Sequence, residues 1–585
     1  MVTNKYITRI ASVIMAAAVI LCLMASLFSD KLQEVYGNNA VTMKYESKLF
    51  STDQIMDIDI LMDEDDWNDM LENAISEEYY SCDVVVNGKT FYSVGIRPKG
   101  NTSLSSIVND PDTDRYSFKL EFDHYIEGQT CYGLDKLILN NNYADATNMK
   151  EAIVYDMYQY LGVDASLYNY AKISVNGDYR GVYLALEAVE DSFMLRNYGT
   201  EDGNLYKPES MGIGGGVDGN GFPQKGEMPD GEDFPQKGEM PDGADFPQKG
   251  EMPDGEDFPQ KGEMPDGEDF PQMGEAPNGE AADIKMGIMG GNGGADLNYT
   301  DDDLDSYSTI WDDEITDTDK KDHKRVVEAL KNISEGTDLE TYMDIDNILK
   351  YMAVHTFVVN DDSLSGTMAH NYYLYEYNGR LNILPWDYNL SFGGMSMDGK
   401  MGGQSLGATS VINDAIDTPF SITDFFDALL ENEEYLEQYH GYLNELVEKY
   451  VNGGEFEKTY ERIRSQIDDL VGNDPTAFYS YEEYEEAANM LIEVVQLRAK
   501  SVSGQLAGTI PSTDEGQQQD SSNLIDGSDI DLSVMGSFSG GGGGNEGQGK
   551  DNGFAGTPQP FDAGDVSPIS EEKADLQDSN QDSVK

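Results

Sequence analysis

The sequence predicts an α+β protein with a β-rich N-terminal lobe and a helical C-terminal lobe. Residues 46–207 contain short alternating strand patterns joined by Asn-Gly turns, such as Asn87-Gly88, which are typical of β-hairpins. From Asp319 onward, apolar residues recur at helical spacing instead. A low-complexity insertion, residues 208–300, separates the two lobes, and residues 508–585 have a composition typical of disorder.

The chain is strongly acidic. Its 585 residues include 110 Asp or Glu and only 38 Lys or Arg, which gives a formal net charge of −72. Because this charge repels phosphate backbones, nucleic acid is not an expected partner. A basic protein or divalent cations would be attracted instead. Much of the acidic charge lies in low-complexity segments, so it bears on solubility more than on fold.

An apolar run at residues 10–28 follows Lys5 and Arg9. The run is just long enough to span a bilayer as a helix, and its positive flank places the N-terminus in the cytoplasm and the rest of the chain outside. A cleaved signal peptide is the alternative, but residues 25–30 form poor cleavage sites. We therefore expect residues 1–28 to be a single-pass membrane anchor, with secretion as the alternative.

Only three cysteines are present, and one of them, Cys22, lies in the apolar run. The other two, Cys82 and Cys131, could form a disulfide outside the cytoplasm. Two buried free thiols are the equally common alternative, and the spacing does not match a metal site.

A basic, Gly-rich stretch lies at residues 95–103. It contains Arg97, Lys99 and Gly100, followed by small hydroxyl residues. Because the backbone can approach a ligand closely at Gly and the two cations can face oxygen atoms, a turn of this composition suits a bound polyphosphate. A solvated surface turn is the alternative, and the spacing differs from that of a Walker A loop.

The alternating pattern at residues 117–122 predicts a strand that turns Lys119 away from its apolar neighbours. A helix predicted from about Thr147 to Gly162 follows, with Glu151 in its first turn. A strand lysine that pairs with a glutamate on the next helix is the ion pair of protein kinases, so we predict a Lys119–Glu151 pair. The alternative is an exposed lysine and a glutamate that serves only the helix dipole.

Another hairpin, at residues 171–186, runs into Glu187. In a protein kinase the strand before the interlobe hinge ends similarly, so we predict that a nucleotide base lies near residues 187–189. Lys207, which ends the next short strand, is a second candidate for a phosphate contact.

The insertion contains a repeated unit, FPQKGEMPDGED, whose Phe recurs every 12 residues from Phe222 to Phe270. A unit with one Phe, two Pro and two Gly cannot bury a core, so we predict a flexible segment. In the C-terminal lobe, a Gly/Met/Ser segment at residues 395–408 is predicted to be an activation or substrate loop. Helices are predicted near residues 421–431, 434–452, 455–471 and 480–505.

The functional prediction depends on residues 357–394. An apolar run there ends in two acids, Asp361 and Asp362, and a hairpin with an Asn378-Gly379 turn leads to a third acid, Asp387, just before a Gly-rich turn. In phosphotransferases of the kinase type, one acid accepts the hydroxyl proton and a second, after a short hairpin, holds Mg²⁺. Turn acids that cap a buried hairpin are the structural alternative.

Four motifs together resemble the CotH kinase family, an atypical protein-kinase-like group. They are GIRPKGNTS at residues 95–103, LNNNY at residues 139–143, GVYLALE at residues 181–187, and HNYYLY with PWD at residues 370–387. The resemblance covers roughly residues 45–207 and 301–507. It implies a two-lobed kinase-like fold and ATP-dependent phosphorylation of Ser or Thr on secreted or spore-coat proteins.

By this resemblance, Asp362 is the catalytic base and Asp387 is the metal ligand, with the adjacent Asp361 as a rival for the base. In a kinase catalytic loop the metal-binding Asn lies about five residues past the base. Thr367 occupies that position here, so the pattern fails at this point. The candidates to replace this ligand are Asn371 and Asn389.

The implied cofactors are ATP and Mg²⁺ or Mn²⁺, and the expected partners are a basic, Ser/Thr-rich protein and the membrane. A different class of function is a surface interaction or adhesion protein on a degenerate kinase-like fold. The predicted anchor, the repeats and the negative charge suit display outside the cell, where ATP is scarce. The presence of both Asp362 and Asp387 favours an enzyme instead.

Overall fold

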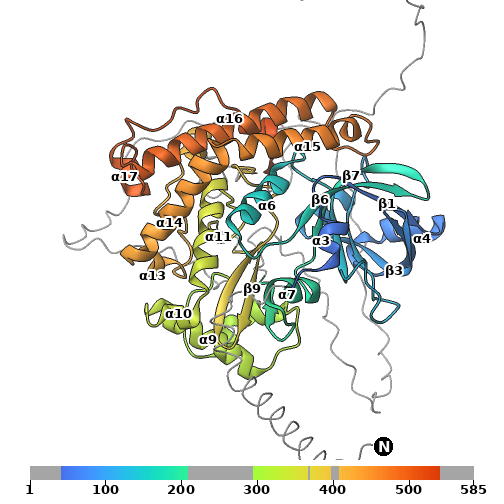
Figure 1. The fold of residues 1–585 in the computed structure, drawn as a ribbon, viewed down its shortest axis with the longest axis horizontal. Helices are drawn as coiled ribbons and strands as arrows, with labels where there is room; N and C mark the ends of the chain where they lie inside the picture. The colour runs from blue at the N-terminus through green and yellow to red at the C-terminus, as the bar shows by residue number, and fades with distance from the viewer. Residues whose placement is uncertain (1–40, 209–293, 367–368, 397–406, 540–585) are drawn as a thin grey trace, which may run out of the picture. The chain divides into compact units, whose positions relative to one another are not determined.

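The structure is a computed structural model that describes residues 41–208, 294–366, 369–396 and 407–539. These residues belong to one compact unit, in which a strand-rich N-terminal part is followed by helices (Figure 1). The mixed composition, with strands first and helices later, confirms the coarse prediction. The finer prediction of two kinase-like lobes stays a prediction.

The predicted membrane anchor and the 12-residue repeats lie outside the described residues. Within the described ranges, no helix combines the length and the apolar character needed to cross a bilayer. The predicted insertion is too long at its C-terminal end, because residues 294–300 pack into the unit. Ala295 and Leu297 there are fully buried.

Seven strands close into a barrel, which the local strand patterns did not predict. The order is β1-β2-β3-β4-β5-β7-β6, and β6 closes the barrel by pairing in parallel with β1. Apolar side chains that alternate along the strands, such as Ile58, Ile96 and Leu120, fill the interior. The strand bounds are β1 Met56–Leu61, β2 Tyr80–Val86, β3 Lys89–Lys99, β4 Ser117–Glu121, β5 Lys136–Asn140, β6 Tyr168–Val175 and β7 Asp178–Glu187.

Helices join the barrel strands, and one of them, α6 (Lys150–Leu161), is central to the site. Gly162 ends α6 in a left-handed conformation with φ +73°, as the sequence predicts. The face of α6 that carries Ile153 and Met157 is fully buried in the larger core. The other helices here are α3 Lys44–Lys48, α4 Glu64–Glu72, η1 Ala74–Ser76, α5 Thr102–Val108 and α7 Asp191–Tyr198.

A second sheet joins sequence-distant segments in the order β10-β9-β8. Strand β8 (Asn204–Tyr206) precedes the insertion, whereas β9 (Tyr372–Tyr377) and β10 (Arg380–Pro385) form the predicted hairpin with its turn at Asn378-Gly379. Before this hairpin lie η2 Leu304–Tyr307, α8 Ser308–Asp312, α9 Lys320–Ser334, α10 Leu339–Tyr342 and α11 Ile345–Val358.

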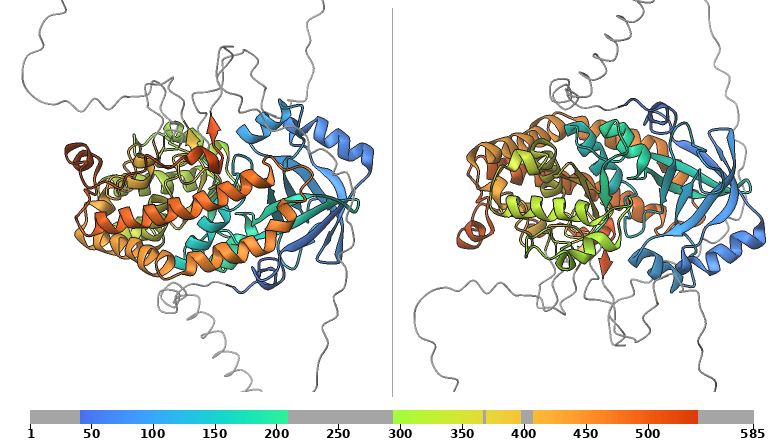
Figure 2. Two further views of the ribbon diagram at one scale, coloured as in Figure 1. Left: turned by 90° about the horizontal axis from the view of Figure 1, so that it is seen from above. Right: turned by 90° about the horizontal axis from the view of Figure 1, so that it is seen from below.

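The later helices largely follow the predicted ranges. The longest, α16, runs along the helical part of the unit in all the views (Figures 1 and 2). The helix predicted at residues 421–431 is wrong, because only α13 forms there and Thr423 caps an irregular turn through Phe425 N–H. The bounds are α12 Ala408–Asn413, α13 Asp427–Leu430, α14 Glu433–Glu445, the π-helix η3 Leu446–Val451, α15 Glu455–Val471 and α16 Tyr481–Leu506.

The prediction that disorder begins at residue 508 is wrong for residues 508–539. This segment contains α17 (Asp514–Gln519), η4 (Leu532–Met535) and β12 (Phe538–Ser539), and β12 pairs in parallel with β11 (Met395–Ser396). Ile510 and Met535 are buried. Polar composition indicated a solvated chain, but two apolar anchors and the backbone pairing suffice to hold it in place.

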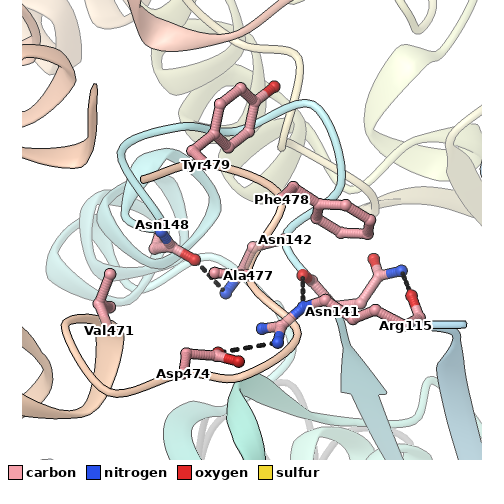
Figure 3. Close-up of a pocket in the computed structure, with 9 residues that line it drawn as sticks. All are labelled: Arg115, Asn141, Asn142, Asn148, Val471, Asp474, Ala477, Phe478 and Tyr479. Carbon is pink, nitrogen blue, oxygen red and sulfur yellow. Dashed lines mark hydrogen bonds and ion pairs between the residues drawn. The ribbon is translucent and has the colours of Figure 1, made fainter. Parts of the chain in front are cut away.

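A fully buried ion pair connects the barrel to the turn between α15 and α16. Nη1 of Arg115 lies 2.8 Å from Oδ2 of Asp474, and Arg115 also donates to the carbonyl of Asn141 (Figure 3). A further hydrogen bond from Arg115 reaches the carbonyl of Val182. The pocket beside this pair has a volume of only about 10 Å³, which is room for about one water molecule. It is therefore too small to be a nucleotide site.

Candidate active site

Three side chains from different elements form a hydrogen-bonded row at the end of the barrel. Lys99, the last residue of β3, donates from Nζ to Oδ1 of Asn140 at 3.2 Å. Asn140, the last residue of β5, donates from Nδ2 to Oε2 of Glu151 at 2.9 Å. Asn140 therefore bridges the lysine and the glutamate, and the first turn of α6 delivers the carboxylate to this row.

The predicted Lys119–Glu151 pair is wrong, and strand register explains why. Across the β3–β4 ladder, Lys119 lies opposite Arg97, two residues before the end of β3 where Lys99 lies. From that position, Nζ of Lys119 reaches Oε1 of Glu190 at 2.5 Å, and Lys136 binds the other oxygen of the same carboxylate. Lys99 therefore takes the place that the sequence assigned to Lys119.

Strand β10 delivers Asp387 to the same region. The backbone of Asp387 is left-handed, with φ +58°, and its carbonyl accepts a 3.4 Å hydrogen bond from Nδ2 of Asn360. Nζ of Lys99 lies 5.5 Å from the ring centre of the neighbouring Trp386. Burial raises the pKa of Asp387, and the positive charge of Lys99 opposes that rise. Asp387 and Lys99 thus lie within electrostatic reach of each other.

Asp362 lies on the same side of the site, and neighbouring polar groups hold its carboxylate. Its Oδ1 lies 2.9 Å from Nε2 of His370, and its Oδ2 accepts a 2.9 Å hydrogen bond from Nδ2 of Asn371. After burial and Lys99, the charge of Asp362 is the next influence on the pKa of Asp387, which it raises. The charge of Asp362 therefore acts on Asp387.

The adjacent Asp361 is a buried acid whose carboxylate lies near other acids. Burial, followed by the charge of Asp362, raises the pKa of Asp361. Burial also raises the pKa of Asp414 to about 7, and Arg498 opposes that rise while the charge of Asp361 adds to it. The hydrogen bonds from His370 and Asn371 are made to Asp362, and they distinguish the two candidates for the base.

Burial and mutual repulsion disfavour the charged forms of the acids at this site. Burial, followed by the charge of Asp387, raises the pKa of Glu151 to about 8. Burial also lowers the pKa of Lys99, against the pull of Asp387. Two buried acceptor atoms, Oε1 of Glu151 and Oδ1 of Asn360, have no hydrogen-bond partner in the described structure. Repelling carboxylates and unsatisfied oxygens are the environment that a divalent cation relieves.

Among the described residues, no three His, Cys, Asp or Glu side chains are grouped closely enough to hold a metal by themselves. Mg²⁺ commonly binds through one or two carboxylates plus substrate phosphates, and Asp387 supplies one such carboxylate. The donor set therefore fits a cation that arrives with a nucleotide.

Two of the remaining predicted residues lie at the site in supporting positions. The positive charge of Lys207 lowers the pKa of both Asp387 and Lys99, so Lys207 contributes to the electrostatics of the site. Asn389 donates from Nδ2 to the carbonyl of Tyr143 at 2.9 Å, which ties the segment after Asp387 to the loop before α6. Asn371 uses its amide nitrogen to orient Asp362, as described above.

Two other predicted residues are engaged elsewhere. Arg97 forms an ion pair with Glu77, and residues 95–99 belong to β3 rather than to the expected phosphate-binding turn. Glu187 is fully buried, and its carboxylate accepts hydrogen bonds from Tyr45 at 2.5 Å and from Arg196 at 2.6 Å. The Glu187 side chain cannot contact a nucleotide, and the place of the base near residues 187–189 stays a prediction.

Both cysteines outside the apolar run, Cys82 and Cys131, are free and buried, so the disulfide alternative is wrong.

The sequence did not identify Asn140 and Asn360 as site residues. Asn140 lies within the LNNNY block, and Asn360 directly precedes the two acids. Both positions were visible, but only the folded chain shows that their amides face Lys99, Glu151 and the Asp387 backbone.

The electrostatics of Glu151 predict how stability depends on pH. Its pKa is about 8 in the folded chain against an ordinary value of 4.5, so folding takes up a proton between these values. The stabilisation from the neutral carboxyl is fully present below the ordinary pKa and is lost as the pH rises towards the folded pKa. Glu151→Gln is neutral at every pH. We expect its Tm to match wild type near about pH 5 and to exceed wild type at about pH 8.

Thermal melting of both proteins across this pH range, without metal or nucleotide, measures the difference. The control is Glu328→Gln, which changes an exposed glutamate on α9 and should give parallel curves. A constant offset between Glu151→Gln and wild type at all pH values would contradict the account of this buried carboxyl.

Comparison with known proteins places these residues in a family. The CotH kinase protein family matches residues 96–502, which is well over half of the chain. The match includes Lys99, Asn140, Glu151, Asp362 and Asp387. Among curated proteins, none matches the chain. The resemblance inferred from the motifs is therefore confirmed, and the chain belongs to the CotH kinase protein family.

Proposed function

We propose that the protein is an ATP-dependent protein Ser/Thr kinase of the CotH type. Family membership supports a kinase-like function. The observation that carries the proposal is the convergence of Lys99, Glu151, Asp362 and Asp387 from four separate segments onto one charged site. This set supplies the cation, the base and the metal ligand that phosphoryl transfer requires.

Each residue has a distinct role in this proposal. Asp387 would hold Mg²⁺ or Mn²⁺, which supplies charge neutralisation at the terminal phosphates when it is bound. Lys99 and Lys207 contribute positive charge for phosphate oxygens, and Asn140 with Glu151 fixes the position of Lys99. Positioning and charge stabilisation, rather than covalent chemistry, account for most of the catalysis of this reaction.

Asp362 is the proposed base. Its carboxylate would accept the proton of a Ser or Thr hydroxyl as the hydroxyl oxygen attacks the terminal phosphorus and ADP leaves. The contacts from His370 and Asn371 leave the carboxylate little rotational freedom, so the accepting oxygen is fixed in advance. Asp361 is not assigned this role, because the positioning hydrogen bonds from His370 and Asn371 are made to Asp362.

The proposed substrate is a basic, Ser/Thr-rich protein outside the cytoplasm, either secreted or part of a spore coat. The net charge of −72 favours a basic partner and disfavours nucleic acid. The kinase-like lobes proposed for residues 46–207 and 301–507 would place the nucleotide between them, and a membrane anchor in residues 1–28 would keep the domain outside.

Transfer of labelled phosphate from ATP to a basic, Ser-rich protein tests the assignment of the acids. We expect Asp387→Asn and Asp362→Asn each to lower kcat by about 10² or more, because each removes a group that acts on the transferring phosphoryl or the hydroxyl. Asp361→Asn is the matched control, because it neutralises the adjacent acid and leaves Asp362 with its hydrogen bonds to His370 and Asn371. We expect it to keep activity within a few-fold of wild type.

Equal labelling by wild type and Asp387→Asn would contradict the metal-ligand assignment. Loss of activity in Asp361→Asn but not in Asp362→Asn would exchange the two roles. If the wild-type protein binds no nucleotide with Mg²⁺ or Mn²⁺, the proposed kinase function is wrong and the adhesion alternative is favoured.

The two strand lysines provide a second, independent test. Lys99→Met should lower kcat/KM for ATP by about 10² or more, because it removes a cation from the phosphate site. Lys119→Met should leave kcat/KM nearly unchanged, because Lys136 still neutralises Glu190. Steady-state kinetics with ATP as the varied substrate measures both. A large loss of kcat/KM in Lys119→Met with little loss in Lys99→Met would contradict this account and favour Lys119 as the phosphate-site lysine.

A further inference from the structure

The C-terminal strap, residues 508–539, is folded although it lies beyond the range matched by the family. It leaves the end of α16 and contacts three segments in turn. These are α12, the strand β11 that follows Asp387, and the loop at residues 141–148 that precedes α6. Two of these segments adjoin residues of the proposed site.

The first contact fixes α12, the helix that follows residues 397–406. The side chain of Asn413, which is fully buried, donates to the carbonyl of Ile525 and accepts from its N–H, both at 2.8 Å. The N–H of Gly527 donates to the hydroxyl of Thr409 at 3.0 Å. The strap therefore adds partners to the buried Asn413 side chain, which also donates to the carbonyl of Thr409 and accepts from the hydroxyl of Ser501.

The second contact holds the segment directly after Asp387. The N–H of Phe538 donates to the carbonyl of Gly394 at 2.9 Å, and β12 continues as a parallel strand beside β11. Leu532 packs against the backbone of Gly393, where a Cβ would lie 3.1 Å from its methyl carbon. Together with the α12 contact, this binds both ends of the predicted activation or substrate loop.

The third contact closes over the loop at residues 141–148. The carbonyl of Met535 accepts from the N–H of Ala146 at 3.1 Å, and the Phe538 ring lies 6.4 Å from the ring of Tyr143. Tyr143 is the residue whose carbonyl binds Asn389. The strap thus touches the loop at the point where it meets the segment that carries Asp387.

This loop needs support from outside itself. Three of its non-glycine residues, Asn142, Ala144 and Asn148, have left-handed φ angles between 52° and 60°. Left-handed φ angles are unfavourable for residues other than glycine, so the loop persists only where its surroundings hold it. Arg115 and Phe478 contact it on one side, as Figure 3 shows, and the strap contacts it on another.

The loop also connects the two parts of the Lys99 row. Asn140 immediately precedes it and Glu151 follows shortly after it, so a shift of the loop changes the distance between these partners. We propose that the strap is a positioning element of the active site. By holding the loop and the segment after Asp387 together, the strap keeps the side chains of Glu151 and Asp387 in place relative to Lys99. This inference rests on the proposed kinase function.

Two glycines provide a matched pair of variants in the full-length chain. Gly536 has φ +81°, and a Cβ there would lie 2.6 Å from the carbonyl oxygen of Ala144 and 2.8 Å from the nitrogen of Ala146. Gly508 has φ +69° with no atom within 4 Å of a Cβ. Both Gly536→Ala and Gly508→Ala place an alanine at positive φ, but Gly536 also has ψ +146°, a combination that essentially only Gly adopts, and its Cβ would meet the loop. Gly536→Ala therefore forces the strap away from the loop, whereas Gly508→Ala controls for positive φ alone.

The test measures kcat and KM for ATP in four proteins besides wild type. These are Gly536→Ala, Gly508→Ala, a chain that ends at Ala507 and a chain that ends at Ser539. We expect Gly536→Ala and the chain ending at Ala507 to lose about tenfold or more in kcat, because misplaced groups at a phosphoryl-transfer site lose alignment. Gly508→Ala and the chain ending at Ser539 should stay within about twofold of wild type.

A synthetic peptide of residues 508–539 distinguishes positioning from general stability. Added to the chain that ends at Ala507, it should restore kcat, and it should slow hydrogen exchange in residues 141–151. Unchanged kcat in that shortened chain would overturn the inference. A loss of kcat that follows Tm and is not restored by peptide would also overturn it.

Failure of the proposed function would look different from failure of this inference. If wild type transfers no phosphate, the kinase proposal fails whatever the strap does. Hydrogen exchange alone then tests whether the strap positions the loop at residues 141–148. Faster exchange at residues 141–151 in Gly536→Ala than in Gly508→Ala supports it, and equal exchange in the two variants contradicts it.

Discussion

The structure of the candidate site depends on the position of Lys99 between two carboxylates. Asn140 links Lys99 to Glu151 by hydrogen bonds, and the charge of Asp387 raises the pKa of Lys99 against the effect of burial. Because the lysine and both acids are largely shielded from water, each strongly affects the pKa of the others. The barrel end, the first turn of α6 and the hairpin β9–β10 all serve to bring these three charges together.

Local patterns predicted the parts of the fold that local chemistry decides. The Asn378-Gly379 turn indicated the hairpin, and Gly162 indicated the end of α6, because each needs a left-handed backbone at one position. The spacing of Asp362 and Asp387 around the hairpin singled out two acids, and the charge of Asp362 raises the pKa of Asp387 in the folded chain. Barrel closure was not predictable, because β1 and β6 are far apart in sequence.

The errors have a common physical origin in long-range register and packing. Lys119 and Lys99 both lie on strands in the same charged face, and only the β3–β4 register shows which one reaches Asn140 and Glu151. Residues 508–539 read as disordered from composition, yet Met535 and the β11–β12 pairing anchor them. Composition measures how much apolar surface a segment has, but not whether a groove elsewhere accepts it.

A structure with Mn²⁺ and a non-hydrolysable ATP analogue, with the metal located by its anomalous scattering, tests the central claim most directly. The account predicts a manganese peak bound to the Asp387 carboxylate, with Nζ of Lys99 at the phosphates and Asp362 facing an open position beside the terminal phosphate. A peak remote from Asp387, or a nucleotide bound elsewhere with Asp387 and Lys99 still shielded from it, would contradict the account.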